Sequence, residues 1–138
     1  MDISDCQRAP TGPTGSFKVL VVDDHSATRK AILAVLDSAF PTCELHGVGS
    51  AEEALDYCSK QAQDIVLMDI SLPGMNGIEA TGQIKARHPR THVVMHSSND
   101  MQIFRDESTA AGAFAFISKR HTAHELVRVM ALLMPSAA

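Results

Sequence analysis

Polar side chains that could do chemistry follow directly after short apolar runs of the chain. They comprise three carboxylates, a hydroxyl and an ammonium: Asp23, Asp24, Asp69, Ser97 and Lys119. Three carboxylates gathered in one place would repel one another unless a cation neutralised them. Hard oxygen ligands suit magnesium, which keeps several waters and commonly binds a phosphate oxygen of the substrate. The residue types therefore point to a magnesium site that handles a phosphoryl group.

Asp69 is the candidate nucleophile of this set, because a carboxylate can form a covalent aspartyl phosphate. Lys119 could balance the negative phosphoryl oxygens, and the Ser97 hydroxyl could donate a hydrogen bond to one of them. Phosphoryl transfer depends mainly on positioning and charge stabilisation. An Asp, a metal ion, a cation and a hydroxyl would therefore suffice for it.

The elements that must position these residues are predicted by the alternation of short apolar runs with stretches of helical period. Strands are expected at Lys18–Val22, Cys43–Val48, Ile65–Met68, His92–Met95 and Ala113–Ile117. Helices are expected from Ser26 to about Ala39, Ala51 to Gln61, after Gly77 to about Arg87, Met101 to Ala111 and Thr122 to about Met134. Five such units indicate an α/β fold with a parallel sheet. In such sheets ligands bind at the carboxyl ends of the strands, where the polar residues lie.

Local signals are expected to fix the helix ends. Ser26 is expected to cap the first helix, and Ser50 with Glu53 forms a capping-box pattern before the second. Thr122 with Glu125 has the same pattern before the last helix. Between the third strand and third helix, residues 70–77 are rich in turn formers and long enough to shape a site.

Composition fits one soluble globular domain, because the chain has 138 residues, of which 45% are hydrophobic and 20% charged. The net charge of -4 argues against broad electrostatic binding to nucleic acid. Three scattered cysteines without a Cys-x-x-Cys pair favour a reduced, cytoplasmic compartment. No apolar run has the length of a signal peptide core or a membrane span. Residues 1–16 are interpreted as a flexible tail.

The seven histidines show no spacing typical of metal ligands. Those considered are His25, His88, His92, His96 and His121. They are expected to face solvent or to be structural.

Four motifs together resemble the receiver domains of bacterial two-component response regulators. They are VVDD at Val21–Asp24, DISLPGMNG at Asp69–Gly77, VVMHSS at Val93–Ser98 and GAFAFISK at Gly112–Lys119. Each is weak alone, but their order and spacing together are specific. The resemblance runs from Lys18 to about Met134 and implies a receiver domain over residues 17–138. It also implies a flavodoxin-like (βα)5 doubly wound fold with strand order 2-1-3-4-5.

The resemblance assigns roles residue by residue. It makes Asp69 the phosphoacceptor and places Ser97 and Lys119 against the phosphoryl oxygens. The implied Mg²⁺ site consists of Asp23, Asp24, Asp69 and the backbone carbonyl of Ser71. No other cofactor is implied. The chain would be a signalling switch and not an enzyme, with only self-phosphorylation and slow self-dephosphorylation.

The implied partner is a sensor histidine kinase or a histidine phosphotransfer protein, which donates the phosphoryl group. Ser97 and Phe116 would then switch the surface of the fourth helix, fifth strand and fifth helix, through which a homodimer could form. Neither nucleic acid nor membrane would be contacted directly by this chain. Two residues depart from the common pattern. Arg120 replaces a proline that often follows the lysine, and Phe116 replaces a frequent tyrosine.

Two other functions fit parts of the pattern. A phosphatase of the haloacid dehalogenase type also uses an Asp nucleophile, magnesium and a lysine. Its nucleophile follows the first strand in a D-x-D pattern, whereas this chain has adjacent acids there and a lone Asp69 after the third strand. A receiver that serves only for docking would normally have lost Asp69 or Lys119, and both are present.

Overall fold

The protein is described by a computed structural model that covers residues 16–98 and 101–135. The expected tail over residues 1–16 lies, except for Ser16, outside the described residues. The strands are β1 (Lys18–Val22), β2 (Glu44–Val48), β3 (Ile65–Asp69), β4 (His92–Ser97) and β5 (Ala115–Ser118). The helices are α1 (Ser26–Ala39), α2 (Ala51–Lys60), α3 (Gly77–Arg87), α4 (Gln102–Ala111), the one-turn 3-10 helix η1 (Lys119–His121) and α5 (Thr122–Leu133).

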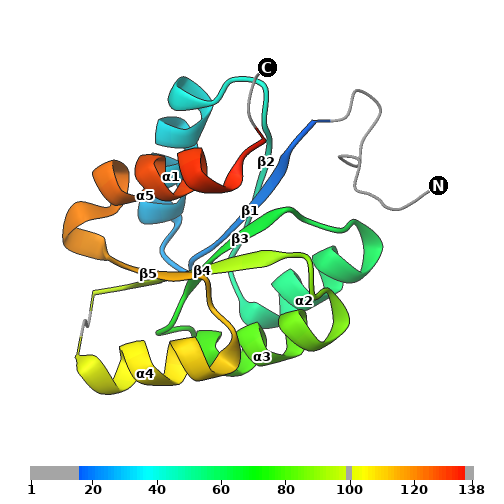
Figure 1. Cartoon of the computed structure of the whole chain (residues 1–138), viewed down its shortest axis with the longest axis vertical. Helices are drawn as coiled ribbons and strands as arrows, with labels where there is room; N and C mark the ends of the chain where they lie inside the picture. The colour runs from blue at the N-terminus through cyan, green and yellow to red at the C-terminus, as the bar shows by residue number, and fades with distance from the viewer. Residues whose placement is uncertain (1–15, 99–100, 136–138) are drawn as a thin grey trace.

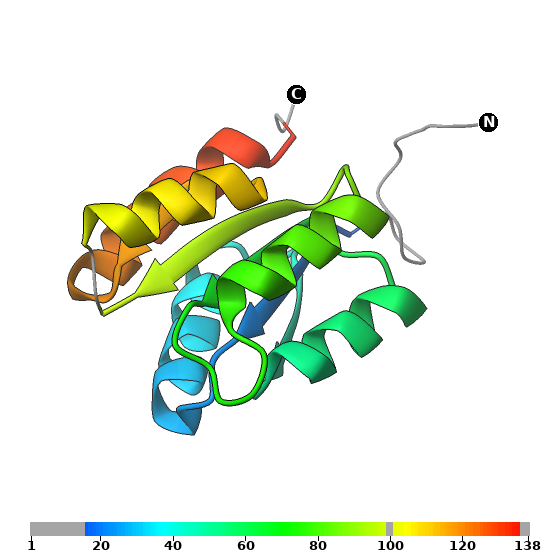
Figure 2. The ribbon, with the colours of Figure 1, turned by 90° about the horizontal axis from the view of Figure 1, so that it is seen from below.

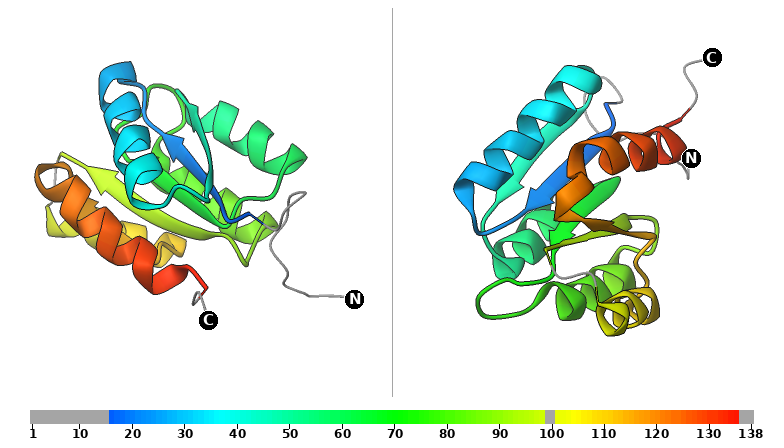
Figure 3. Two further views of the ribbon diagram at one scale, coloured as in Figure 1. Left: turned by 90° about the horizontal axis from the view of Figure 1, so that it is seen from above. Right: turned by 90° about the vertical axis from the view of Figure 1, so that its left-hand side faces the viewer.

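The five strands form one parallel sheet in the order β2-β1-β3-β4-β5, which confirms the expected α/β topology. Helices α1 and α5 cover one face, and α2, α3 and α4 cover the other (Figure 1). Figure 2 shows the face with α2, α3 and α4, and the left panel of Figure 3 shows the face with α1 and α5. After β1 the chain forms β2 on one side of β1, and it later returns to form β3 on the other side of β1. The carboxyl ends of β1 and β3 are therefore the topological switch point.

Two apolar cores hold the sheet between its helix layers. Strands β1 and β3 are buried along their whole length, as expected of central strands covered on both faces. Alternate residues feed the two cores, so that Leu20 and Met68 face α2 and α3 whereas Val21 and Leu67 face α1 and α5. Burial of each such side chain contributes about 1.5–3 kcal/mol. The strand ends are therefore fixed on a rigid frame.

Helix ends confirm some of the expected caps and correct others. The Ser50 hydroxyl accepts a hydrogen bond from the backbone N–H of Glu53 at 3.1 Å, which confirms the cap of α2. Ser26 is not a cap but the first residue of α1, and His25 occupies the capping position. The cap predicted at Thr122 is also wrong. Thr122 is the first residue of α5. Its hydroxyl donates to the carbonyl of Lys119 at 3.2 Å and lies 2.8 Å from Nε2 of His96 on β4, so these partners take the group that the local pattern assigned to the helix.

The fifth strand begins two residues later than expected, at Ala115. The reason is the end of α4, where Gly112 adopts a left-handed conformation and the Ala113 N–H still donates to the carbonyl of Ser108 at 3.0 Å. None of the helices formed by the described residues combines the length and the apolar character needed to cross a bilayer.

Candidate functional site

The carboxyl edge of the sheet brings together the acidic residues of β1 and β3. Asp23 follows β1, and Asp69 is the last residue of β3. Both side chains are almost fully buried, with 0% and 1% of their residue surfaces exposed. Asp24, next along the chain, faces solvent. The site is therefore a partly covered acidic pocket at the switch point of the fold.

Lys119, which follows the edge strand β5, supplies the cation of this pocket. It begins η1 directly after β5, and its Nζ lies 3.1 Å from Oδ2 of Asp69 and 3.2 Å from Oδ2 of Asp23. Burial alone would lower the pKa of the ammonium, but the carboxylates of Asp69 and Asp23 outweigh it and raise the pKa of Lys119. Burial also raises the pKa of Asp69, although Lys119 opposes this shift. The pocket therefore holds a permanent cation beside a carboxylate that is costly to keep ionised.

One carboxylate oxygen of this pocket is incompletely satisfied. Oδ1 of Asp23 accepts a hydrogen bond from the backbone N–H of His25 at 2.8 Å. Oδ2 of Asp23 is buried and forms no well-aligned hydrogen bond among the described residues, although Nζ of Lys119 lies 3.2 Å from it. A buried charged oxygen without a well-aligned hydrogen bond is rare and costs free energy. It is the type of ligand that a hard cation would satisfy.

The donor set fits a magnesium ion. One ligand atom from each of Asp23, Asp24, His25 and Asp69 lies within 4.8 Å of all the others. Three of the four are carboxylate oxygens, the ligands that Mg²⁺ prefers. His25 was not expected in this group, although its position directly after the acidic pair is a signal that could have indicated it. Its Nδ1 lies 3.4 Å from Oδ1 of Asp23 and 3.3 Å from Oδ1 of Asp24.

The loop after β3 holds the candidate nucleophile in place. The backbone N–H of Ser71 donates to Oδ1 of Asp69 at 3.1 Å, and the Ser71 residue itself is exposed. The expected contribution of the Ser71 carbonyl to the metal stays a prediction. At the other end of the loop, Asn76 caps α3 by accepting from the N–H of Glu79 at 2.9 Å. These bonds fix both ends of the segment that borders the site.

The two candidate switch residues lie on β4 and β5. Ser97 is the last residue of β4 and is fully buried, one position after His96, which pairs with Asp69. Its contact with a phosphoryl oxygen stays a prediction. Phe116 is half-buried against the core of α2 and α3, and the guanidinium carbon of Arg105 on α4 lies 4.6 Å from its ring centroid. Phe116 thus contacts both the core and α4.

His96, which was expected to face solvent or to be structural, is a buried polar residue beside the site. It is 1% exposed, and its Nε2 lies 2.8 Å from Oγ1 of Thr122 while its Nδ1 lies 4.0 Å from Oδ2 of Asp23. Burial, together with the charge of Lys119, lowers the pKa of His96 to about 4. The ring is therefore neutral at neutral pH. A single histidine within an apolar strand gives no sequence signal of such distant partners.

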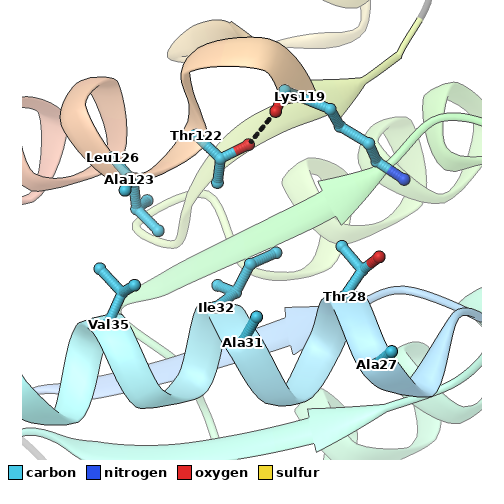
Figure 4. A pocket seen from close by; sticks show the side chains of 9 residues that line it. All are labelled: Ala27, Thr28, Ala31, Ile32, Val35, Lys119, Thr122, Ala123 and Leu126. Atoms are coloured by element: carbon cyan, nitrogen blue, oxygen red, sulfur yellow. Dashed lines mark hydrogen bonds between the residues drawn. The ribbon is translucent and has the colours of Figure 1, made fainter.

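A groove of about 460 Å³ runs between α1 and α5 and ends at Lys119 (Figure 4). It is lined by Ala27, Thr28, Ala31, Ile32, Val35, Lys119, Thr122, Ala123 and Leu126. Its walls are mostly apolar, and Lys119 brings a positive charge to the end nearest the acidic pocket. The pocket is therefore bordered by a surface on which another molecule could rest.

Comparison with known protein families decides the identity of the fold and site. The family model described as "response regulator receiver domain" matches residues 19–131. The chain belongs to this receiver domain family. The match covers both acidic strand ends and Lys119, so the pocket described above lies within the receiver domain. Receiver domains of response regulators are signalling switches of two-component systems.

Two relatives of this chain are longer proteins, of which it matches only a part. The chain is 33% identical over 117 residues to response regulator GacA of Pseudomonas syringae pv. syringae, covering 85% of this chain and 55% of that protein. It is 31% identical over 111 residues to response regulator UvrY of Escherichia coli K12, covering 80% of this chain and 51% of that protein. The chain thus spans about half the length of these relatives.

A solved structure supports the same fold. The crystal structure of a CheY-like response regulator receiver domain protein from Methanospirillum hungatei JF-1 superimposes with a TM-score of 0.79 at 25% identity. The alignment covers 85% of this chain and 92% of that one. The flavodoxin-like (βα)5 arrangement expected from the motifs is therefore confirmed.

Proposed function

We propose that this receiver accepts a phosphoryl group on Asp69, with Mg²⁺ bound beside it, from a sensor histidine kinase or a histidine phosphotransfer protein. The observation that carries the proposal is the position of Asp69, buried at the switch point with Oδ2 3.1 Å from Nζ of Lys119. The carboxylate of Asp23 beside it has a buried oxygen without a well-aligned hydrogen bond, which suits a metal ligand. A nucleophile, a cation and metal ligands therefore converge on one point.

The transfer step follows from these positions. A carboxylate oxygen of Asp69 forms a bond to phosphorus while the bond from phosphorus to the donor histidine nitrogen breaks, and that nitrogen keeps the electron pair. Lys119 balances the charge on the phosphoryl oxygens, and Ser97 donates a hydrogen bond to one of them. Mg²⁺, when bound by Asp23, Asp24, Asp69 and the Ser71 carbonyl, neutralises the remaining negative charge. The Ser71 N–H holds Asp69 in one orientation throughout.

The output is proposed to be a change in the surface formed by α4, β5 and α5. A phosphoryl group adds negative charge and strong acceptors, which draw Ser97 towards Asp69 and free space into which Phe116 turns. Because Arg105 lies over the Phe116 ring, a movement of the ring reaches α4 directly. Exposed apolar side chains belong to α4, to the residue before β5 and to α5. They are Ile103, Phe114 and Leu132, which are 55%, 48% and 75% exposed.

The receiver is assigned to residues 17–138 and to the cytoplasm, where its kinase would act. The net charge of -4 suits a domain that signals to other proteins and makes no direct contact with nucleic acid or membrane. The apolar groove between α1 and α5 ends at Lys119, so a partner that rests there could bring a phosphohistidine to Asp69.

The experiment that tests this function is incubation with acetyl phosphate and magnesium, followed by intact-mass measurement. We expect the mass to increase by one phosphoryl group in the wild type and not in Asp69→Asn. Undiminished labelling of Asp69→Asn would contradict the assignment. A phosphatase of the haloacid dehalogenase type would instead hydrolyse many equivalents of an ester such as p-nitrophenyl phosphate. A docking-only receiver would take no phosphoryl group at all.

A further inference from the structure

The buried polar residue that the proposed phosphoryl chemistry does not use is His96. It lies on β4 between Met95 and Ser97, and together with Val94 it faces the side of the sheet covered by α1 and α5. An apolar side chain at this position would need no hydrogen-bond partner. A buried imidazole there costs free energy unless its nitrogens are partnered. Its partners therefore indicate what it does.

The hydrogen-bond directions around Thr122 determine the state of the His96 ring. The single hydroxyl proton of Thr122 is donated to the carbonyl of Lys119 at 3.2 Å, a bond that Figure 4 shows. Oγ1 of Thr122 must then accept from Nε2 of His96, which lies 2.8 Å away. In the tautomer that fits these contacts, Nε2 carries the ring proton, and Nδ1 lies 4.0 Å from Oδ2 of Asp23. The result is a directed chain from His96 through Thr122 to Lys119.

This chain of hydrogen bonds ends on the backbone carbonyl of Lys119, whose ammonium lies beside Asp69. Lys119 lies in a single 3-10 turn after a strand of four residues, and such short turns have weak internal hydrogen bonds. The Ser118 hydroxyl accepts from the Arg120 N–H at 3.3 Å, which is a long contact. The bond from Thr122 ties the Lys119 carbonyl to the start of α5, and His96 ties Thr122 to the central sheet. His96 is therefore linked through Thr122 to the backbone of the residue that carries Nζ.

We propose that His96 is a positioning residue, which holds Lys119 through Thr122 so that its ammonium lies beside Asp69. The inference rests on the proposed function, in which Lys119 balances the phosphoryl oxygens. Loss of these hydrogen bonds would leave Lys119 in the pocket but would let its backbone shift. Displacement of supporting groups around a site typically reduces activity about 10–100-fold. We expect phosphorylation by acetyl phosphate to slow about tenfold in the absence of the His96 donor.

Four variants test this proposal against a purely structural role. His96→Leu removes the donor, His96→Gln restores an N–H near the position of Nε2, and Thr122→Val removes the hydroxyl without changing the shape of the side chain. The control is Thr91→Val, because Thr91 is buried and its hydroxyl donates to the Gln63 carbonyl at 2.7 Å, just before β4 begins. It loses the same kind of bond at the opposite end of the strand.

Two measurements at a temperature where every variant is folded decide the question. The rate of phosphorylation should fall about tenfold in His96→Leu and in Thr122→Val. It should fall no further when these two substitutions are combined in one protein, and it should recover in His96→Gln. Thr91→Val should keep the wild-type rate. In NMR spectra without phosphate, the signals of the Lys119 ε-methylene should shift in His96→Leu and Thr122→Val but not in Thr91→Val.

The outcomes separate this proposal from the proposed function. If the wild type takes a phosphoryl group and His96→Leu and Thr122→Val do so at the same rate with unshifted Lys119 signals, the positioning role is refuted. Equal slowing of Thr91→Val would refute it as well, because the effect would then be general destabilisation. If the wild type takes no phosphoryl group, the proposed function fails. The Lys119 signals then decide alone whether His96 positions this residue.

Discussion

Gly77 lies so close to the backbone of Asp69 that a β-carbon on Gly77 would overlap the Asp69 carbonyl oxygen. Gly77 is the first residue of α3, and its N–H donates to the carbonyl of Ile70 at 3.1 Å. The loop that leaves Asp69 therefore closes on itself at this point. The absence of a side chain at residue 77 is what lets α3 begin directly beside the backbone of Asp69, the proposed phosphoacceptor.

Gly77→Ala is predicted to destabilise the protein and to impair phosphorylation together. Overpacking of a buried position costs about 1–3 kcal/mol of the free energy of unfolding, and here the displaced atoms belong to the backbone of Asp69. Gly82→Ala is the matched control, because Gly82 lies on the same helix and a β-carbon added to it would meet no atom within 4 Å. It should raise the free energy of unfolding by about 0.5–1 kcal/mol. Urea unfolding of both variants measures the contrast, and equal effects would contradict the close contact.

Magnesium is predicted to stabilise the fold through Asp23 and Asp24. A ligand that binds only the folded state at ten times its Kd adds about 1.4 kcal/mol to the free energy of unfolding. The increase should disappear in the double variant Asp23→Ala, Asp24→Ala. Asp56→Asn removes one charge from the exposed face of α2 and should keep the full increase. Denaturant unfolding with and without magnesium measures each value, and an undiminished increase in the double variant would refute the metal site.

The buried His96 predicts a pH dependence of stability. Its pKa is lowered to about 4 in the folded protein, so the unfolded chain binds more protons between that value and the ordinary 6.5. The stability that neutral His96 contributes is complete above pH 6.5 and is lost as the pH falls towards 4. Between pH 7 and pH 5 the wild type should lose about 2 kcal/mol more than His96→Gln. His92, whose pKa burial also lowers, is present in both proteins. Identical pH profiles in urea unfolding would contradict a buried neutral His96.

The main frame of the site could be predicted from sequence because its signals are local. An acidic pair after an apolar run, and a lone Asp69 after another, must reach the same edge once the runs form a parallel sheet. The order of the strands could not be obtained from the apolar pattern itself, which says nothing about neighbours. It followed from the resemblance of the motifs to receivers.

Features that depend on distant partners could not be predicted. Ser50 and Thr122 have the same local capping pattern, but only Thr122 has competing partners, which are the Lys119 carbonyl and a histidine 26 positions away in the chain. Gly77 resembles a turn residue in the sequence, whereas its function is to allow close approach of two backbone segments. Such contacts exist only after the sheet has brought the elements together.

The proposed switch predicts a spreading response to phosphorylation. Addition of beryllofluoride, a phosphoryl mimic, should shift NMR signals in α4, β5 and α5, because Phe116 contacts Arg105 of α4. Phe116 has no hydroxyl, so no terminal hydrogen bond fixes either position of its ring, and the free protein should already sample the second one. Asp69→Asn with the same mimic is the control and should show no shifts. Changes confined to the loops around Asp69 would rule the mechanism out.

The most direct test of Asp69 as the phosphoacceptor is chemical localisation of the phosphoryl group. Borohydride reduces an aspartyl phosphate to homoserine, so peptide mapping after phosphorylation with acetyl phosphate and magnesium identifies the modified residue. We predict homoserine at position 69 and no other conversion. Homoserine at position 23 or 24, or phosphorylated protein in which Asp69 is unchanged, would contradict the proposed role of Asp69.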